Sequence, residues 1–317
     1  MNAESDRPLV SVFMPAYNQQ DLIAESIESV LAQHYDDWEL IIGDDCSEDN
    51  TYEIIKSYQA KYPDKIVAFR NSTNLGLAGN FNAVLRQCRG KYVAFMGGDD
   101  VLLPYKLALQ VELMKENEAC VLCYHDVEYF DTETGLAIRY QNAGNHGVSA
   151  IVGTSKVVAK AIVERGNSFI AAMSVLARRD AIPQQGFDAR VPITSDWLMW
   201  IEICADNEGT ILFVPGVHAK YRKHSHNVTK TMRSMMREDQ FVTMAIVEAR
   251  YPWLIESVQK LRAVWYLELG YDKMRAREYP VARGLLLYAI RLAGYRWNYI
   301  RPWLGFWLKY GGLYPNR

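Results

Sequence analysis

The sequence predicts an α/β fold: a mostly parallel sheet flanked by helices, with a C-terminal helical extension. Three observations support this prediction. Strand and helix patterns alternate over the first 130 residues. The strand candidates Leu40–Ile42 and Tyr92–Met96 are apolar without alternation, as expected of parallel strands buried on both faces. From about Arg237 onward the pattern is helical. At 50% hydrophobic and 23% charged residues, the 317-residue chain has the composition of a folded protein.

The N-terminal elements follow one another in a regular order. Strands are predicted at Leu9–Met14, Trp38–Gly43, Ile66–Arg70, Tyr92–Met96 and Ala119–Val127. Helices with apolar residues at a 3.6-residue period or with capping residues are predicted between them, at Asp21–Ala32, Asp49–Tyr62, Asn80–Gln87 and Leu103–Asn117. This βαβα order predicts a parallel sheet with right-handed crossovers.

The middle of the chain is less regular. We expect a mobile loop at Asn142–Gly147, a strand at Phe169–Ala177 and a helix at Asp196–Ala205. Two short strands, Ile211–Val214 and Val217–Tyr221, flank a turn at Pro215-Gly216. In the helical extension, breaks are predicted where a proline follows Tyr251, Tyr279 and Arg301.

Composition and charge narrow the classes of protein. Five cysteines without framework spacing fit a reducing compartment. We expect no secretion signal and no membrane-spanning helix, because the apolar runs are too short. The net charge is −2, yet residues 1–216 carry 17 Lys/Arg and 30 Asp/Glu, whereas residues 217–317 carry 18 and 7. The basic C-terminal part predicts an anionic surface or partner, and we expect no nucleic-acid partner.

Two aspartate doublets carry most of the functional information. Asp44-Asp45 and Asp99-Asp100 each follow a buried strand, the second after Gly97-Gly98. Ligands of open α/β sheets bind beyond the carboxyl ends of the strands. Adjacent carboxylates repel unless a cation or hydrogen-bond donor neutralises them. A divalent cation holding a diphosphate, together with ligand hydroxyls, would satisfy both pairs, which predicts a nucleotide-sugar site.

Each candidate has a structural alternative. Either doublet could cap the helix that follows it, and Asp196 or Ser195 could cap the helix at residues 196–205. Cys120, Cys123 and His125 could suggest zinc, but they lie within one strand and no second Cys/His pair has ribbon spacing, which favours a core role. His224 and His226 are not expected to form a zinc site.

Several motifs, in order, resemble family-2 glycosyltransferases with the GT-A fold, of the type that acts on bacterial surface polysaccharides. They are Val10–Asn18, Ser29–Gln33, Glu39–Ser47, Asn74–Asn80, Gly90–Phe95 leading into Asp99-Asp100, Gly186–Asp188, Ser195–Trp200 and Tyr221–His224. Together they cover about residues 8–228. No single motif is diagnostic, but the ordered set is. The resemblance implies a GT-A domain over residues 1–230, followed by a basic, aromatic-rich helical region at 231–317.

The resemblance implies roles for individual residues. Nucleotide-binding residues would be Pro15, Ala16, Tyr17, Asn18, Asp45, Asn80 and Asp99, with Asp45 on the base and Asp99 on the ribose or donor sugar. Asp100 and His224 would hold Mg²⁺ or Mn²⁺. Asp196 would be the catalytic base. Family members commonly carry an additional Asp where Gly97 stands, so the ligand set of the metal has one carboxylate fewer here.

The role of Asp196 is also supported on chemical grounds. Attack by a sugar hydroxyl on an anomeric carbon needs a base on the face opposite the leaving group. A carboxylate at a helix start, beside Trp197 and Trp200, is partly desolvated, which raises its pKa toward a useful value.

The C-terminal tail alternates aromatic and basic residues and has no acid after Glu278. The aromatic residues are Tyr295, Trp297, Tyr299, Trp303, Phe306, Trp307 and Tyr310, and the basic ones are Arg291, Arg296, Arg301 and Lys309. This composition favours association with an anionic membrane surface. A packed helical subdomain or an oligomer contact is the alternative. We therefore expect a cytoplasmic protein, peripheral on the inner face of the cell membrane.

Taken together, these features predict a metal-dependent inverting glycosyltransferase. It would move a sugar from a nucleoside-diphosphate sugar to a hydroxyl of a saccharide or lipid-linked acceptor, in the synthesis of cell-surface polysaccharide. One alternative is a sugar-phosphate nucleotidyltransferase, but Pro15–Gln20 lacks the expected glycine- and lysine-rich phosphate loop. The other is a non-catalytic nucleotide-sugar-binding component of a membrane assembly, which the glycine at position 97 favours.

Overall fold

The computed structural model describes residues 8–141, 150–166, 170–225, 227, 232–294, 300–301 and 303–304. The chain divides into two compact units. The first comprises Met1–Ile162 and Asn167–Thr243, and the second comprises Val163–Gly166 and Met244–Arg317.

A ten-stranded sheet forms the centre of the first unit, with the main strand order β3-β2-β1-β4-β9-β6-β10-β5. The strands are β1 (Val10–Ala16), β2 (Trp38–Asp44), β3 (Ile66–Arg70), β4 (Tyr92–Phe95), β5 (Val101–Leu102), β6 (Cys120–Asp131), β7 (Ala137–Tyr140), β8 (Gly153–Thr154), β9 (Leu176–Arg178) and β10 (Thr210–Lys223). The long pairings, β1 with β2 and β4, β2 with β3, and β6 with β10, are parallel. The antiparallel pairings of β5, β7, β8 and β9 are short. The predicted mostly parallel sheet is confirmed.

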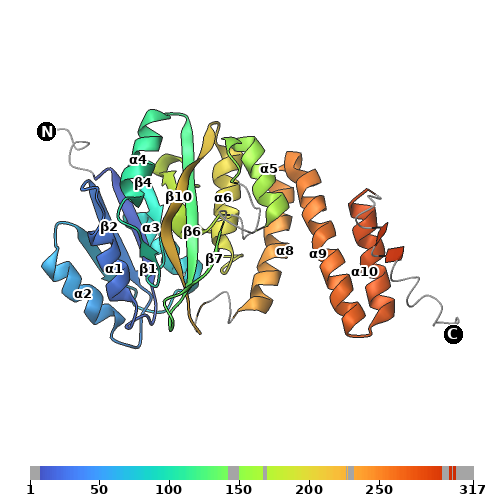
Figure 1. Ribbon diagram of the computed structural model, residues 1–317, viewed down its shortest axis with the longest axis horizontal. Coiled ribbons are helices and arrows are strands. Elements are labelled where there is room, and N and C mark those ends of the chain that lie inside the picture. The colour runs from blue at the N-terminus through green and yellow to red at the C-terminus, as the bar shows by residue number, and fades with distance from the viewer. Residues whose placement is uncertain are drawn as a thin grey trace. The chain divides into compact units, whose positions relative to one another are not determined.

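Helices cover the sheet because the strand side chains alternate between two apolar faces. On one face, Val12 and Leu40 join a core with Ile27 of α1 (Ile23–Leu31), Ile55 of α2 (Thr51–Lys61) and Val111 of α4 (Lys106–Glu116). On the other face an aromatic cluster links β1 and β4 with α3 (Gly76–Gln87) and α6 (Ser195–Asp206). It consists of Phe13, Phe81, Phe95, Phe187 and Trp200. Figure 1 labels strands of this sheet, among them β1, β2, β4, β6 and β10, together with helices α1 to α4 and α6.

The predicted N-terminal strands and helices are confirmed, with ends that differ by up to four residues. Two expectations are wrong. The region predicted as one strand at Phe169–Ala177 contains a 3-10 helix at Ala172–Ser174 and only the short strand β9. Pro215-Gly216 does not end a strand: β10 continues through both residues, and the register with β6 shifts between Val214 and Val217. Gly216 has φ of +102°, so the extra residues form a bulge that a glycine accommodates.

The middle of the chain, which we expect to be less regular, contains β7, β8 and α5 (Ser155–Arg165). The expected loop at Asn142–Gly147 lies outside the described residues.

The second unit contains α9 (Ile255–Arg275) and α10 (Tyr279–Leu292), which pack along each other. Leu286 of α10 meets α9 at Gly270, where an added Cβ would lie 2.7 Å from Leu286 Cδ2. A short 3-10 helix at Pro252–Leu254 separates α8 (Arg233–Arg250) from α9, so the break after Tyr251 is confirmed. The break before Pro280 is also confirmed, at the start of α10.

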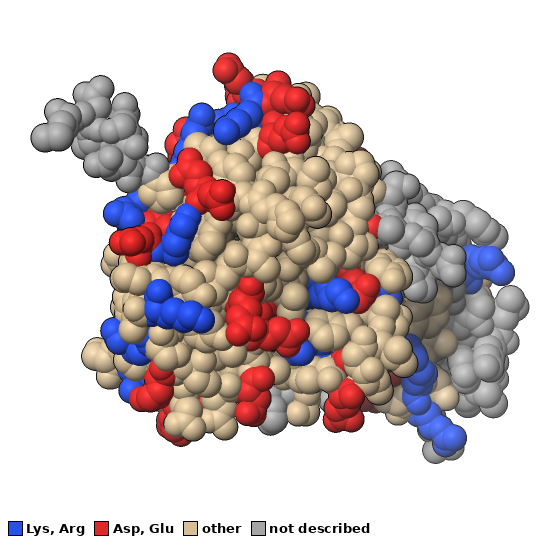
Figure 2. Space-filling view, turned by 60° about the vertical axis from the view of Figure 1, so that its left-hand side comes forward, with Lys and Arg blue, Asp and Glu red and all other residues tan. Residues whose placement is uncertain are grey.

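Most of the aromatic and basic tail residues, and the break predicted at Pro302, lie outside the described residues. Within the described part of the chain, we find no helix that is both long enough and apolar enough to cross a bilayer. Figure 2 shows acidic and basic side chains interspersed over the face brought forward there, despite the acidic composition of residues 1–216.

Candidate functional site

The two aspartate doublets lie at the carboxyl ends of β2 and β4, the two strands that flank β1 in the sheet. Both loops are tied to the end of β1. Asp45 N donates to Ala16 O at 2.9 Å, and Gly98 N donates to Pro15 O at 3.2 Å. The parallel register places Ala16 beside Asp44. The sheet topology therefore brings Pro15, Ala16 and both doublets to one edge, where α/β proteins bind ligands.

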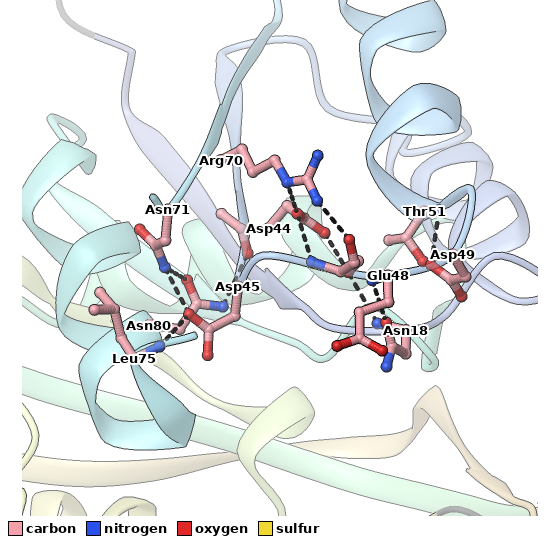
Figure 3. A network of polar contacts seen from close by, with 12 residues as sticks. Asn18, Asp44, Asp45, Glu48, Asp49, Thr51, Arg70, Asn71, Leu75 and Asn80 are labelled. Atoms are coloured by element: carbon pink, nitrogen blue, oxygen red, sulfur yellow. Dashed lines mark hydrogen bonds and ion pairs between the residues drawn. The ribbon is translucent and has the colours of Figure 1, made fainter. Parts of the chain in front are cut away.

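Asp44 is neutralised by the protein itself. Its carboxylate is fully buried and pairs with Arg70 Nε at 3.3 Å. It also accepts hydrogen bonds from Ser47 N at 3.0 Å and from the Ser47 hydroxyl. These contacts turn the chain after β2 into a tight loop, so Asp44 has a structural role (Figure 3).

Asp45 points to the other side of the same loop (Figure 3). Its Oδ1 accepts from Asn71 Nδ2 and from Leu75 N, both at 2.8 Å. Asn80, the buried residue predicted to bind nucleotide, completes the network: its Oδ1 accepts from Asn71 at 3.0 Å and its Nδ2 donates to Gly43 O at 2.9 Å. Because both hydrogen bonds found for Asp45 fall on Oδ1, the network orients the carboxylate at the ligand edge.

Tyr17 and Asn18 differ in what they offer a ligand. Asn18 Oδ1 accepts from Glu48 N at 2.9 Å, and Asn18 N donates to Ser47 Oγ at 3.0 Å. Asn18 has φ of +49°, a conformation that asparagine tolerates better than most residues. Its side chain therefore joins two loops. Tyr17 is 44% exposed, so its ring is open to solvent.

The second doublet has fewer donors. Asp99 Oδ2 lies 3.0 Å from His224 Nε2. Asp100 is 4% exposed, and its Oδ1 accepts a long hydrogen bond, 3.3 Å, from Arg222 N. Burial and the adjacent Asp99 raise the pKa of Asp100 well above its usual value. A carboxylate in this position is stabilised when it binds either a proton or a cation.

Arg222 organises this doublet, a role that the sequence did not reveal. Its buried guanidinium donates from Nε to Asp99 O at 2.9 Å and from Nη2 to Glu25 Oε2 at 2.5 Å. Asn227 bridges the next turn: it donates to Arg222 O at 3.1 Å and accepts from His224 N at 2.7 Å. Arg222 lies within the motif Tyr221–His224, in which the resemblance implies a role only for His224.

A cavity of about 390 Å³ connects the second doublet with Asp196. Among the residues that line it are Pro15, Gly97, Asp100, Asp196 and Trp200. Asp196 lies in the first turn of α6, and its Oδ1 accepts from Trp197 N at 2.8 Å. Burial raises the pKa of Asp196 to about 6. The carboxylate is therefore a base whose strength suits proton transfer near neutral pH.

The start of α6 is held by a residue that the sequence reading missed. Asp239 of α8 accepts hydrogen bonds from Ile193 N at 2.6 Å and Thr194 N at 3.0 Å. The N-cap residue of α6 is Thr194, so neither Asp196 nor Ser195 is the N-cap that the structural alternative required. Asp196 is thereby available to the cavity.

The donor set at the second doublet fits a hard cation that shares its coordination with phosphate. Asp99 lies 3.0 Å from the imidazole of His224, and Asp100 adjoins Asp99. Within the described ranges, no group of three or more His, Cys, Asp and Glu side chains is arranged to hold a metal. Mg²⁺ is commonly bound through one or two carboxylates, with substrate phosphates and water supplying the rest.

Gly97 provides space for this doublet. A Cβ at position 97 would lie 2.6 Å from Asp99 Oδ1 and 3.3 Å from Asp100 Oδ2. Any side chain there would displace the Asp99 carboxylate, so the glycine and the observed position of Asp99 belong together.

The geometry thus separates the predicted site residues into three positions. Pro15, Asp100 and Asp196 line one cavity, and Asp99 and His224 adjoin Asp100. Ala16, Asp45 and Asn80 lie at the end of β2 and β1. Tyr17 and Asn18 lie in the loop after β1.

Comparisons with known proteins concern the family and the fold of the chain. The model of the family "Glycosyl transferase family 2" matches residues 11–171. EpsE of Bacillus subtilis is 44% identical over 110 residues, which are 35% of this chain and 40% of that protein. Escherichia coli WfgD, named as a UDP-Glc:alpha-D-GlcNAc-diphosphoundecaprenol beta-1,3-glucosyltransferase, is 27% identical over 224 residues, 71% of this chain and 81% of that protein.

Solved structures share the fold at low identity. S. aureus TarS 1-349 in complex with UDP-GlcNAc superposes with a TM-score of 0.62 at 14% identity, over 97% of this chain and 93% of that one. The mannosyltransferase PcManGT from Pyrobaculum calidifontis, in complex with GDP-Man and Mn²⁺, has a TM-score of 0.59 at 16% identity, over 96% and 86%. The family model covers half of this chain, and the expected GT-A fold is confirmed. The chain belongs to glycosyltransferase family 2.

Proposed function

We propose that this chain is a metal-dependent inverting glycosyltransferase. It transfers a sugar from a nucleoside-diphosphate sugar to a hydroxyl of a saccharide or lipid-linked acceptor. The observation that carries the proposal is the single cavity that Asp100 and Asp196 line together. A cation-binding carboxylate and a general base on one cavity are what in-line displacement at an anomeric carbon requires.

The nucleotide half of the donor binds at the edge formed by β1 and β2. Asp45, oriented by Asn71 and Leu75, accepts hydrogen bonds from the base. Pro15 and Ala16 contribute backbone, and the exposed ring of Tyr17 supplies an aromatic surface. Asn18 and Asn80 act through the loop and the Asp45 network that they hold. Asp99 contacts the ribose or the donor sugar.

Asp100 and His224 hold Mg²⁺ or Mn²⁺ in this proposal. When bound, such an ion neutralises the charge that develops on the departing diphosphate. The structures of relatives give partial support, since PcManGT was solved with GDP-Man and Mn²⁺. Arg222 keeps the doublet in position through the Asp99 carbonyl.

Asp196 is the proposed base. Its carboxylate takes the proton of the acceptor hydroxyl as the oxygen forms a bond to the anomeric carbon. The bond between that carbon and the phosphate oxygen breaks on the opposite face, and the configuration inverts. The raised pKa of Asp196, about 6, makes the carboxylate a competent acceptor while it stays largely ionised at neutral pH.

The acceptor belongs to cell-surface polysaccharide synthesis in this proposal, and the protein works at the cytoplasmic face of the membrane. Two observations support this. The tail sequence is aromatic and basic, and the printed name of WfgD specifies a diphosphoundecaprenol-linked acceptor. Flotation of the full chain with phosphatidylglycerol vesicles, but not with phosphatidylcholine vesicles, tests the membrane part. Equal flotation with both, or with neither, contradicts it.

The experiment for the proposed chemistry replaces Asp196 by asparagine. Asp196→Asn lowers the turnover of a nucleotide sugar by about 10²–10⁴-fold, the usual contribution of a general base. Binding of UDP or GDP with Mn²⁺ stays within about twofold of the unmodified chain, since a neutral asparagine leaves the doublet untouched. Full turnover by Asp196→Asn excludes this residue as the base.

A non-catalytic binding component is the second candidate, because Gly97 replaces a carboxylate common in the family. The geometry weakens this reading, since the space beside Gly97 holds the Asp99 carboxylate. The two candidates differ in one result. A binding component binds the nucleotide with Mn²⁺ yet hydrolyses or transfers none of a panel of nucleotide sugars.

A further inference from the structure

A row of aromatic and basic side chains lines the cavity that Asp100 and Asp196 share. In the sheet register, Tyr129 of β6 lies beside Arg139 of β7 and beside Tyr221 of β10. Lys223 follows two residues after Tyr221, on the same face of β10. All four residues line the cavity that also contains Asp196. None of the roles proposed above uses them.

Both cations are held against aromatic rings. The guanidinium of Arg139 lies 3.6 Å from the centroid of Tyr129, and Lys223 Nζ lies 4.6 Å from that of Tyr221. The Tyr129 and Tyr221 rings are themselves 4.9 Å apart. Arg139 also donates to Gln141 Oε1 at 3.1 Å. Within the described part of the chain, the partners found for Arg139 are neutral, so the guanidinium keeps its positive charge on the cavity wall.

The row lies close to both proposed catalytic carboxylates. Burial raises the pKa of Tyr129, and the charges of Asp100 and Asp196 raise it further, whereas Arg139 lowers it. The phenol is therefore within electrostatic range of the cation-binding side and of the base.

We propose that Arg139 and Lys223 form an anion subsite that binds a phosphate group carried by the acceptor. This inference rests on the proposed function. A guanidinium and an ammonium on one wall suit phosphate oxygens, and the tyrosine faces suit an attached sugar ring. The acceptor class is thus a saccharide that carries a phosphate group.

The leaving diphosphate of the donor is the other possible source of such an anion. In the proposed function, the divalent cation that Asp100 and His224 would hold already neutralises that diphosphate. Arg139 and Lys223 come from different strands, on the wall that Tyr129 and Tyr221 form. The arrangement therefore favours the acceptor, and the experiment separates the two sources.

The test uses the full chain saturated with UDP and Mn²⁺, so that the donor position is filled. Glucose 1-phosphate is titrated in, with methyl glucoside as its uncharged counterpart, and binding is followed by NMR. We expect glucose 1-phosphate to bind about tenfold more tightly, the effect of one charge-assisted contact. Arg139→Gln and Lys223→Gln each remove that preference.

Lys220→Gln is the matched control. Lys220 lies on β10 next to Tyr221 and pairs with Glu128 at 3.1 Å, on the opposite face of the strand. The control variant keeps the preference. Equal binding of the two sugars by the unmodified chain, or an equal loss in Lys220→Gln, overturns the subsite.

A parallel titration of UDP with Mn²⁺ into each variant assigns the anion. Unchanged UDP affinity in Arg139→Gln and Lys223→Gln supports an acceptor subsite. A loss of UDP affinity by the same factor assigns the pair to the donor diphosphate and overturns the inference. These binding measurements need no turnover, so full activity of Asp196→Asn would refute the proposed base and leave the subsite standing.

Discussion

The two aspartate doublets occupy equivalent places in the sheet and have opposite electrostatic surroundings. Asp44 is paired with Arg70 and Ser47, and Asp45 accepts from Asn71 and Leu75. Asp100, in contrast, is buried beside Asp99 with one long hydrogen bond from Arg222 N. The fold pairs Asp44 of the first doublet with a cationic side chain, whereas Asp100 of the second doublet is buried beside another carboxylate. A repeated sequence feature thus has two different electrostatic environments, set by neighbours that are distant in the chain.

The largest expected difference between the doublets concerns turnover. Asp100→Asn lowers kcat by about 10²–10³-fold, the range for loss of one electrostatic stabiliser of a developing negative charge. Activity assays with saturating Mn²⁺ measure it. A variant that retains more than half of the activity contradicts the role of Asp100.

The same variant has an opposite effect on the ligand-free protein. Because the pKa of Asp100 is raised in the folded state, its carboxylate lowers stability as pH rises above the usual aspartate value. Asparagine lacks this titration. The melting temperature of Asp100→Asn therefore exceeds that of the unmodified chain at pH 8, and the difference shrinks toward pH 4.

Asp44→Asn behaves in the reverse manner. It weakens the contacts to Arg70 and Ser47 in the buried loop and lowers the free energy of unfolding by about 1–3 kcal/mol. Urea unfolding measures this. UDP affinity changes by less than about threefold, because Asp44 faces away from the ligand edge. If Asp44→Asn kept its free energy of unfolding but no longer bound UDP, Asp44 would be a ligand-binding residue and the structural role assigned to it would be wrong.

The pH dependence of turnover is the next largest effect. With a pKa of about 6 for Asp196, kcat/KM falls about tenfold for each pH unit below 6 and is level above 7. The sign follows from the need for an ionised base. A profile measured from pH 4.5 to 8.5, with a nucleotide sugar that is stable in that range, gives the midpoint. A midpoint below 4.5 would mean that Asp196 is not the group that limits the rate.

The smallest effect concerns the support of the second doublet. Arg222→Lys keeps a positive charge near Glu25 but loses the fixed Nε contact to the Asp99 carbonyl. We expect Arg222→Lys to need about tenfold more Mn²⁺ for half-maximal activity, an effect typical of residues that orient metal ligands. Its free energy of unfolding in urea stays unchanged. A matched change outside the site, Arg190→Lys, breaks only an exposed pair with Asp188 and leaves activation unchanged.

Much of the fold could be predicted from the sequence, because buried parallel strands and amphipathic helices leave local patterns. The long strand β10 could not. Pro215-Gly216 has the composition of a turn, and only pairing with β6 on one side and β5 on the other shows that the residues form a bulge. Local composition does not contain that information.

The site shows the same limit. Asp100 and Asp196, which line one cavity, were predicted because carboxylates at strand and helix ends are visible in the sequence. The contrast between the doublets was not, because it depends on Arg70 at the end of β3 and on Arg222 at the end of β10. The nucleotide-binding role of Asn18 stays a prediction, and the hydrogen bond that its side chain accepts from Glu48 N was not visible in the sequence. Partners separated by tens of residues decide these cases.

Binding of Mn²⁺ by the chain saturated with UDP tests the central contrast most directly. Calorimetric titrations at pH 6 and pH 8 compare the unmodified chain with Asp100→Asn and Asp44→Asn. We predict that Mn²⁺ affinity rises with pH in the unmodified chain and in Asp44→Asn, and that Asp100→Asn loses both the affinity and its pH dependence. Equal Mn²⁺ affinity in the unmodified chain and Asp100→Asn would contradict the account.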